Sequence, residues 1–203
     1  MADTKSERTR ELLVAEALRQ FLMSGYENVS LHQISEATNL SKGALTYHFD
    51  SKKVLFQAAV EYFFDTLETK RTLPESAELP PLRTYLEMSF RGIPQISELL
   101  ASIFGIHDTS MNYHRLLLDV IQVLGDYELL HRYFSPALQS LHTMISRARE
   151  DGQIREDIDV SSLAHQILAT IEGSYVIQFY IKSDDFERTA ASMVENLWRG
   201  LRS

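Results

Sequence analysis

The sequence contains no cysteine among its 203 residues. Disulfide bonds and thiolate zinc sites are therefore excluded, and the composition fits a reducing compartment. Long apolar runs are also missing, because the strongest ones, 99–106 and 116–124, are too short or interrupted to span a bilayer. Residues 1–20 have no apolar core of a signal peptide. These absences predict a cytoplasmic protein with no membrane partner.

Motifs that carry catalysis or hold cofactors are missing as well. The chain has no glycine-rich phosphate loop and no nucleophile elbow. Glu128 and His131 match one Glu-x-x-His element of di-iron helical bundles, but that chemistry needs a second copy, which does not occur. Asp157 and Asp159 fit helix capping better than acid–base catalysis. We therefore expect a protein without enzyme activity, metal or cofactor. The alternative from a different functional class is a helical ligand-binding or metal-dependent enzyme.

What the sequence does contain is a nearly continuous helical pattern. Hydrophobic residues make up 44% of the chain, enough for a full core in one or two domains. Apolar periodicity predicts an all-α fold of about nine to ten helices. They are expected at about 7–24, 31–38, 42–49, 51–71, 82–92, 95–106, 110–124, 126–151, 160–182 and 186–201, after a polar, flexible segment at 1–7. Residue Pro136 should kink the helix at 126–151 unless it falls in a first turn.

A proline-rich stretch without periodicity, 73–81, is the expected domain junction. It separates a first domain at 1–56, with a connecting helix at 51–71, from a second domain at 72–203. The net charge of −8 is unevenly distributed between the two. Residues 1–56 hold seven Lys/Arg and seven Asp/Glu, so the acidity lies entirely in the remainder. The overall charge therefore does not exclude a phosphate-binding patch in the first domain.

The most specific pattern lies in residues 28–55. Ser30 followed by Gln33 forms a capping box at the start of one short helix, and Ser41 caps a second. Between them Asn39 can adopt the left-handed conformation that ends a helix. Two short helices joined this tightly predict a helix-turn-helix, whose second helix enters the major groove of DNA.

The second helix of this motif, Lys42–Phe49, supplies most of the expected DNA contacts. Leu45 and Phe49 lie four residues apart and should face the core, which turns the other side chains toward the partner. Gly43 lowers helix stability, and close approach of the backbone to nucleic acid would explain it. At the start of the next helix, Lys52 and Lys53 suit a phosphate. The predicted DNA-binding residues are Ser30, His32, Ser41, Lys42, Gly43, Ala44, Thr46, Tyr47, His48 and Lys52.

These residues carry a family resemblance. The pattern Gly25-Tyr26, Ser30, Ile34, Ser41-x-Gly43, Leu45, Tyr47-His48-Phe49 and Ser51-Lys52 resembles the N-terminal signature of the TetR family of transcriptional regulators, most strongly over residues 8–60. In that family the lysine matching Lys52 contacts a backbone phosphate. Thr46 departs from the pattern, since the family usually has a tyrosine there that grips DNA, and Asn39 replaces a glycine. We expect that Tyr47 can supply the missing hydroxyl.

The resemblance implies a homodimer built by the last two helices. Apolar stripes on 160–182 and 186–201 fit such an interface, although a core within one chain would produce the same pattern. The predicted interface residues are Leu163, Ile167, Ile171, Ser174, Phe186, Met193 and Leu197. We call the helix-turn-helix at 28–55 the reader. Two readers, one from each chain and about 34 Å apart, would bind a palindromic operator.

Aromatic and polar residues between the reader and these helices have the composition of a small-molecule pocket. The predicted effector-binding residues are Phe90, Phe104, His107, Tyr113, His114, Leu117, Ile121 and Tyr127, with plain core and hydrogen-bonded structural histidines as the alternative. The sequence and the resemblance together predict a homodimeric repressor that an unknown small-molecule effector releases from double-stranded DNA. An activator, or a regulator without an effector, is the alternative within the same class.

Overall fold

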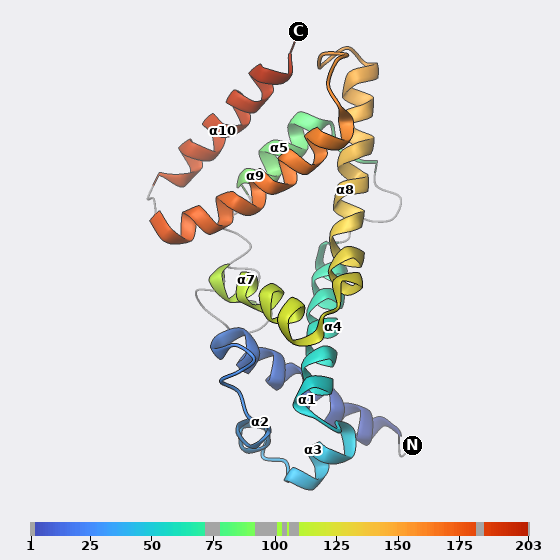
Figure 1. Ribbon diagram of the computed structural model, residues 1–203, viewed down its shortest axis with the longest axis vertical. Helices are drawn as coiled ribbons and strands as arrows, with labels where there is room; N and C mark the ends of the chain where they lie inside the picture. The colour runs from blue at the N-terminus through green and yellow to red at the C-terminus, as the bar shows by residue number, and fades with distance from the viewer. Residues whose placement is uncertain are drawn as a thin grey trace. The chain divides into compact units, whose positions relative to one another are not determined.

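The computed structural model describes residues 3–71, 78–91, 101–102, 105, 110–181 and 185–202 (Figure 1). All regular elements of this part are helical, which confirms the all-α prediction. The elements are α1 (Asp3–Ser24), α2 (Leu31–Thr38), α3 (Lys42–His48), α4 (Lys52–Arg71), α5 (Leu82–Arg91), α7 (Ser110–Asp119), η1 (Val120–Leu124), α8 (Tyr127–Glu150), α9 (Val160–Ile181) and α10 (Phe186–Leu201). Most of the helix expected at 95–106 falls outside the described residues.

Two predicted boundaries need correction. Helix α1 begins at Asp3, so Lys5 lies in a helical turn and its carbonyl accepts a hydrogen bond from the Thr9 hydroxyl at 2.9 Å, where the sequence predicted a flexible segment. The helix expected at 110–124 changes at Val120 into the π-helical segment η1, which ends at Gly125 in the left-handed conformation. Helix α8 contains Pro136 in its interior and continues past it.

The chain forms two compact units. Unit 1 comprises Met1–Glu75 and Leu100–Glu128, and unit 2 comprises Ser76–Leu99 and Leu129–Ser203. The first crossing falls inside the proline-rich stretch where the sequence places the domain junction. However, 100–128 returns to the N-terminal unit, which a junction at a single position does not predict. Helix α7 and segment η1 therefore belong to the same unit as the predicted reader.

Unit 1 has α1 as its central helix, in contact with α2, α4 and α7. The face of α1 that carries Leu18 and Phe21 is fully buried, because its apolar residues recur at helical spacing. Helix α4 contributes Phe56 and Phe63 to the same core, and Leu116 is buried on α7. A phenylalanine pair on α1 and α4, Phe21 and Phe56, meets edge to face with ring centroids 5.0 Å apart.

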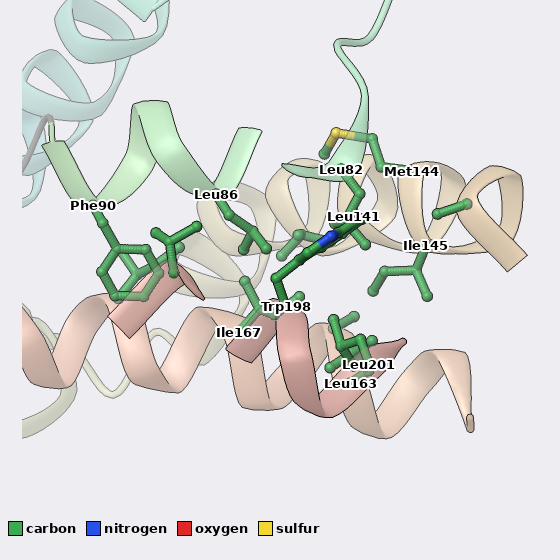
Figure 2. Packing of buried hydrophobic residues seen from close by; sticks show 14 of the residues in the cluster. Leu82, Leu86, Phe90, Leu141, Met144, Ile145, Leu163, Ile167, Trp198 and Leu201 are labelled. Carbon is green, nitrogen blue, oxygen red and sulfur yellow. The ribbon is translucent and has the colours of Figure 1, made fainter. Parts of the chain in front are cut away.

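Unit 2 consists of α5, α8 from Leu129 onward, α9 and α10, packed around one apolar cluster (Figure 2). Figure 2 shows side chains from all four helices converging, with Leu86 of α5 close to Trp198 of α10 and Ile167 of α9. The loop after α8 is joined to the end of α10 by a hydrogen bond from the Arg155 amide to the Leu201 carbonyl, 2.9 Å long.

The residues predicted for a dimer interface belong mostly to this cluster. Five of them are buried within the chain itself: Leu163, Ile167, Ile171, Ser174 and Phe186. The other two, Met193 and Leu197, are partly buried against the same cluster. The apolar stripes on α9 and α10 thus face their own unit, so the five buried residues are part of its core, and a dimer interface on these two helices stays a prediction. A second chain would have to use the opposite faces of the two helices.

Candidate nucleic-acid interface

Two helix caps hold the helix-turn-helix in shape. The Ser30 hydroxyl accepts from the Gln33 amide at 3.2 Å, while the Gln33 side chain accepts from the Ser30 amide at 2.7 Å, so the predicted capping box is present. Ser41 caps α3 by accepting from the Ala44 amide at 3.1 Å. These bonds satisfy amides at the N-termini of the two helices that have no partner within their own helix.

The turn between α2 and α3 depends on Asn39. Its φ of 54° is in the left-handed region, where asparagine costs less than other non-glycine residues. The Asn39 amide donates to the Glu36 carbonyl at 3.1 Å and so ends α2. Asparagine therefore performs here the turn for which the resemblance led us to expect glycine.

Helix α3 presents one face outward and one face to the core. Leu45 and Phe49 are buried, as predicted. Tyr47 is 80% exposed, and its ring lies 5.1 Å from that of His48, measured between centroids. The predicted contact residues on the outer surface of α2 and α3 are exposed or half-buried: Ser30, His32, Ser41, Lys42, Gly43, Ala44, Thr46, Tyr47 and His48. The helix thus offers a short polar surface with a projecting aromatic side chain.

Neighbouring groups limit what two of these residues can do. The Thr46 hydroxyl donates back to the Lys42 carbonyl at 3.0 Å, so it is engaged with its own helix and leaves only acceptor capacity for a partner. His32 stands 3.4 Å from Glu36, Nδ1 to Oε2, on a well-exposed part of α2. A negative charge beside His32 makes it a poorer phosphate ligand than the sequence alone suggests.

Lys52 occupies a less exposed position than a typical phosphate ligand. Its ammonium group donates to the carbonyls of Tyr26 at 2.8 Å and Val29 at 2.9 Å. The same nitrogen lies 4.1 Å from the centroid of the Tyr26 ring, a cation–π distance. Lys52 therefore ties the start of α4 to the turn between α1 and α2, with one ammonium hydrogen left for a phosphate. The adjacent Lys53 is exposed.

Tyr26 is the centre of this turn. Its ring packs against Phe56 at 4.9 Å and Phe21 at 5.8 Å, both measured between centroids. Burial raises the pKa of its phenol, with a smaller contribution from the nearby Glu27 carboxylate. The phenol therefore stays neutral well above physiological pH, and Lys52 interacts with an uncharged ring.

Two further residues reach this turn from α7. Asp119 accepts from the Tyr26 amide at 2.8 Å, and the Arg115 guanidinium donates to the Leu22 carbonyl. The sequence analysis did not single out either residue. Their spacing of four places both on one face of α7, but nothing in the sequence indicates that this face meets a turn 93 residues earlier.

The predicted effector residues fall in different parts of the molecule. Tyr113, His114, Leu117 and Ile121 are half-buried on α7 and η1 in unit 1, and the Tyr113 ring lies 6.1 Å from that of Phe63 on α4. Phe90 is buried in unit 2, and Tyr127 is 67% exposed. Phe104 and His107 lie outside the described residues. The sequence thus grouped side chains from two separate units, and an effector site formed by all of them stays a prediction.

A hollow of about 200 Å³ lies between α5 and α10 in unit 2. It is lined by Arg83, Glu87, Phe90, Arg91, Ala190, Ala191, Val194 and Glu195. Arg83 bridges Glu87 at 3.2 Å and Glu195 at 3.1 Å across its rim. Pockets for drug-sized ligands measure roughly 300–1,000 Å³, so this hollow is small for the predicted effector.

Within the described residues, no cluster of three or more metal-ligating side chains occurs. The same part of the chain contains no helix with the length and apolarity of a membrane span.

Comparison with known proteins identifies the same N-terminal region. Residues 13–59 match the family model "Bacterial regulatory proteins, tetR family". The HTH-type transcriptional repressor DhaR of Mycobacterium sp. (strain GP1) is 28% identical over 166 residues, covering 81% of this chain and 79% of that protein. The probable acrEF/envCD operon repressor of Escherichia coli (strain K12) is 24% identical, covering 97% and 89%.

Similarity at the level of the fold extends over almost the whole chain. A TetR-family transcriptional regulator from Cytophaga hutchinsonii superposes with a TM-score of 0.71 at 23% identity, covering 98% of this chain and 96% of the other. The match to the family model coincides with the capped helices and the exposed face of α3. Together the family model, the relatives and the fold support a DNA-binding transcriptional regulator of the TetR family.

Proposed function

We propose that this regulator is a homodimeric repressor that reads a palindromic operator with α3 and leaves it when a small molecule binds. The exposed face of α3 is the observation that carries the proposal, since Ser41 caps the start of α3 and Ser30 caps the start of the preceding α2. The first helical turn of α3 presents Lys42 and Gly43 to the outside, which is the end of a recognition helix that meets base edges.

Pairing of two chains follows from the size of this reading surface. Helix α3 has seven residues and reaches only a few base pairs, so one copy cannot give strong sequence preference. Family members typically dimerise. We place the pairing surface on the outward face of α9, where Ala169 is exposed, Gly173 is half-buried and Ile177 is 56% exposed.

Repression is proposed by analogy with the relatives, two of which are named as repressors. A repressor that an effector releases needs two conformations, and the effector acts only through the difference in its affinity for them. We propose that the effector binds preferentially to a form in which the two copies of α3 are wrongly spaced for successive major grooves.

Selection of bound sequences from random double-stranded DNA tests the proposed reading. We expect the wild-type chain to enrich a palindrome with half-sites about 34 Å apart. If Lys42 contacts guanine, Lys42→Met should lose the base preference at one position in each half-site. The lost discrimination between guanine and the other bases should be about 1–3 kcal/mol. An unchanged profile would remove Lys42 from the base contacts. No enrichment at low salt would refute the reading altogether.

Gly43→Ala should separate stability from DNA binding. A β-carbon at Gly43 would meet only the Ser41 hydroxyl, at 3.8 Å, so the chain itself has room for alanine. Alanine is favoured over glycine inside a helix by roughly 1 kcal/mol. We expect a more stable protein in chemical denaturation whose operator affinity is about tenfold lower, because the methyl group obstructs close backbone approach to DNA.

Gly200→Ala is the matched control for this substitution. Gly200 also lies on a helix with open space around it, but in α10, outside the reader. It should add stability without changing DNA affinity. Wild-type operator affinity in Gly43→Ala would show that the α3 backbone does not approach DNA closely.

A further inference from the structure

Helix α1 ends just before the hydrogen bond that would have joined the Leu22 carbonyl to the Tyr26 amide. The Leu22 carbonyl and the Tyr26 amide are four residues apart, which is the spacing of an α-helical hydrogen bond. The step does not occur, because Gly25 turns the chain with a φ of 78° and its amide closes the helix on the Phe21 carbonyl at 2.8 Å. Both groups are therefore left without their helical partner.

Helix α7 supplies a substitute partner for each of them. The Arg115 guanidinium donates to the Leu22 carbonyl, and the Asp119 carboxylate accepts from the Tyr26 amide at 2.8 Å. The two side chains are one helical turn apart, so a single face of α7 binds both ends of the missing bond. A donor meets the carbonyl and an acceptor meets the amide, which makes this face chemically complementary to an opened helix end.

The close approach depends on Gly25. A β-carbon there would lie 3.2 Å from Cδ and Nε of Arg115, so any side chain would press against the guanidinium. The positive φ that ends α1 and the space that admits Arg115 are therefore provided by one glycine. The Nη2 of Arg115, which donates to the Leu22 carbonyl, also donates to Oδ1 of Asn112 on the same helix, at 3.1 Å.

Residue Tyr26 connects the bonds from α7 to the helix-turn-helix, because its amide binds Asp119 and its carbonyl binds Lys52. The Tyr26 carbonyl accepts from Lys52 at the start of α4, and Lys52 also binds the Val29 carbonyl, immediately before the cap of α2. The position of Tyr26 thus fixes where α2 begins and where α4 follows α3. A change in the turn after Leu22 would reach both ends of the helix-turn-helix.

The Arg115 contact is not fully satisfied. Its Nε is buried and has no hydrogen-bond partner among the residues that the structure describes. A buried donor of a charged group without a partner opposes the folded arrangement, and it regains a hydrogen bond to water when the contact opens. This unsatisfied donor lowers the cost of releasing Arg115 from the turn.

We propose that Arg115 and Asp119 are positioning residues of the reader, which keep the end of α1 open in the form that binds DNA. When α7 withdraws, the Leu22 carbonyl and the Tyr26 amide pair with each other, α1 lengthens through Gly25, and the chain enters α2 in a different direction. Helix α7 also bears Tyr113 and His114, two of the predicted effector residues. A ligand that moves α7 would therefore move Arg115 and Asp119, which bind the turn next to the reader. This inference rests on the proposed DNA-binding function.

Operator binding by the full-length chain tests the inference. Arg115→Met and Asp119→Ala should each lower affinity by about tenfold. The double variant should be little weaker than either single variant, because both residues hold the same turn. Asp119→Asn, which retains an acceptor oxygen for the Tyr26 amide, should bind nearly as the wild type does. Gln122→Ala, at an exposed position on η1, is the control and should bind normally.

Two readouts distinguish positioning from general damage. The salt dependence of binding should keep its slope in every variant, since neither residue meets a phosphate. Backbone chemical shifts of Gly25 should move toward helical values in Asp119→Ala, while the Tyr26 amide remains protected from exchange by its new bond to Leu22. If the role of these residues were merely structural, the Gly25 shifts would not move toward helical values. Asp119→Asn would then bind the operator no more tightly than Asp119→Ala.

The outcomes separate this inference from the function on which it rests. A wild-type chain that binds no DNA refutes the proposed function. If the wild type binds its operator and both Arg115→Met and Asp119→Ala bind equally well, the positioning role alone is wrong. It is also wrong if Asp119→Asn loses as much affinity as Asp119→Ala, because the amide acceptor then does not matter.

Discussion

Lys52→Met is expected to destabilise unit 1 by about 2–3 kcal/mol. Two charge-assisted hydrogen bonds of roughly 1.5–3 kcal/mol each are lost, but water replaces part of their contribution because Lys52 is only half-buried. The carbonyls of Tyr26 and Val29 would lose their partner, and the cation over the Tyr26 ring would disappear. Because Trp198 is the single tryptophan and lies in unit 2, its fluorescence reports on that unit, whereas far-UV circular dichroism reports on all helices. We expect the dichroism transition to move to lower denaturant and the fluorescence transition to move less.

Lys53→Met is the matched control, one residue along α4 and exposed. It should leave stability within about 0.5 kcal/mol, as surface substitutions usually do. If Lys53 meets a phosphate, its loss should reduce the slope of log affinity against log salt by about one charge. The family role expected for Lys52 predicts the reverse, a stable Lys52→Met protein with a reduced salt slope. That result would show that its contacts to the turn contribute little.

The reader could be predicted in detail because its determinants are local. Ser30 and Gln33 lie three residues apart, so their reciprocal bonds follow from the sequence alone. Asn39 in the left-handed conformation needed only the knowledge of which residues tolerate it. The inward position of Leu45 and Phe49 follows from their spacing. Each of these features depends on residues within one or two turns of each other.

The contacts around Tyr26 could not be predicted in this way. Asp119 and Arg115 meet a turn that precedes them by 93 residues in both cases, and only the packing of α7 against α1 brings them there. Lys52 looked like a phosphate ligand because sequence shows a charge near a helix start, and does not show which carbonyls lie within its reach. The assignment of α7 to unit 1 has the same origin.

The apolar stripe on α9 shows a different limit of sequence patterns. Its spacing correctly predicts that Ile167 and Ile171 are covered, but periodicity does not specify whether the covering surface belongs to the same chain. The structure assigns that stripe to the core of unit 2. The outward face, with Ala169, Gly173 and Ile177, lacks a strong apolar pattern because small residues carry little hydrophobic signal. Small residues nevertheless let two helices approach closely.

Gly173→Arg should therefore convert the protein to a monomer. Operator binding should weaken by about 100-fold or more, because two linked binding modules typically bind that much more tightly than one module alone. A β-carbon at Gly173 meets nothing within 4 Å among the described residues, so the chain can accept a side chain there, and arginine favours a helix more than glycine does. Light scattering should give the 23.3 kDa of one chain, against twice that mass for the wild type. Each unpaired reader would then bind a half-site alone.

Thr143→Arg adds the same charge at an exposed position on α8 and should leave both the mass and the affinity unchanged. Comparing it with Gly173→Arg separates loss of pairing from a general effect of added positive charge, which on its own would strengthen binding to DNA. If Gly173→Arg keeps the wild-type mass, the chains pair through another surface. If it becomes monomeric and still binds the full operator as tightly as the wild type, the two readers do not act together, and the affinity must come from a single copy of α3.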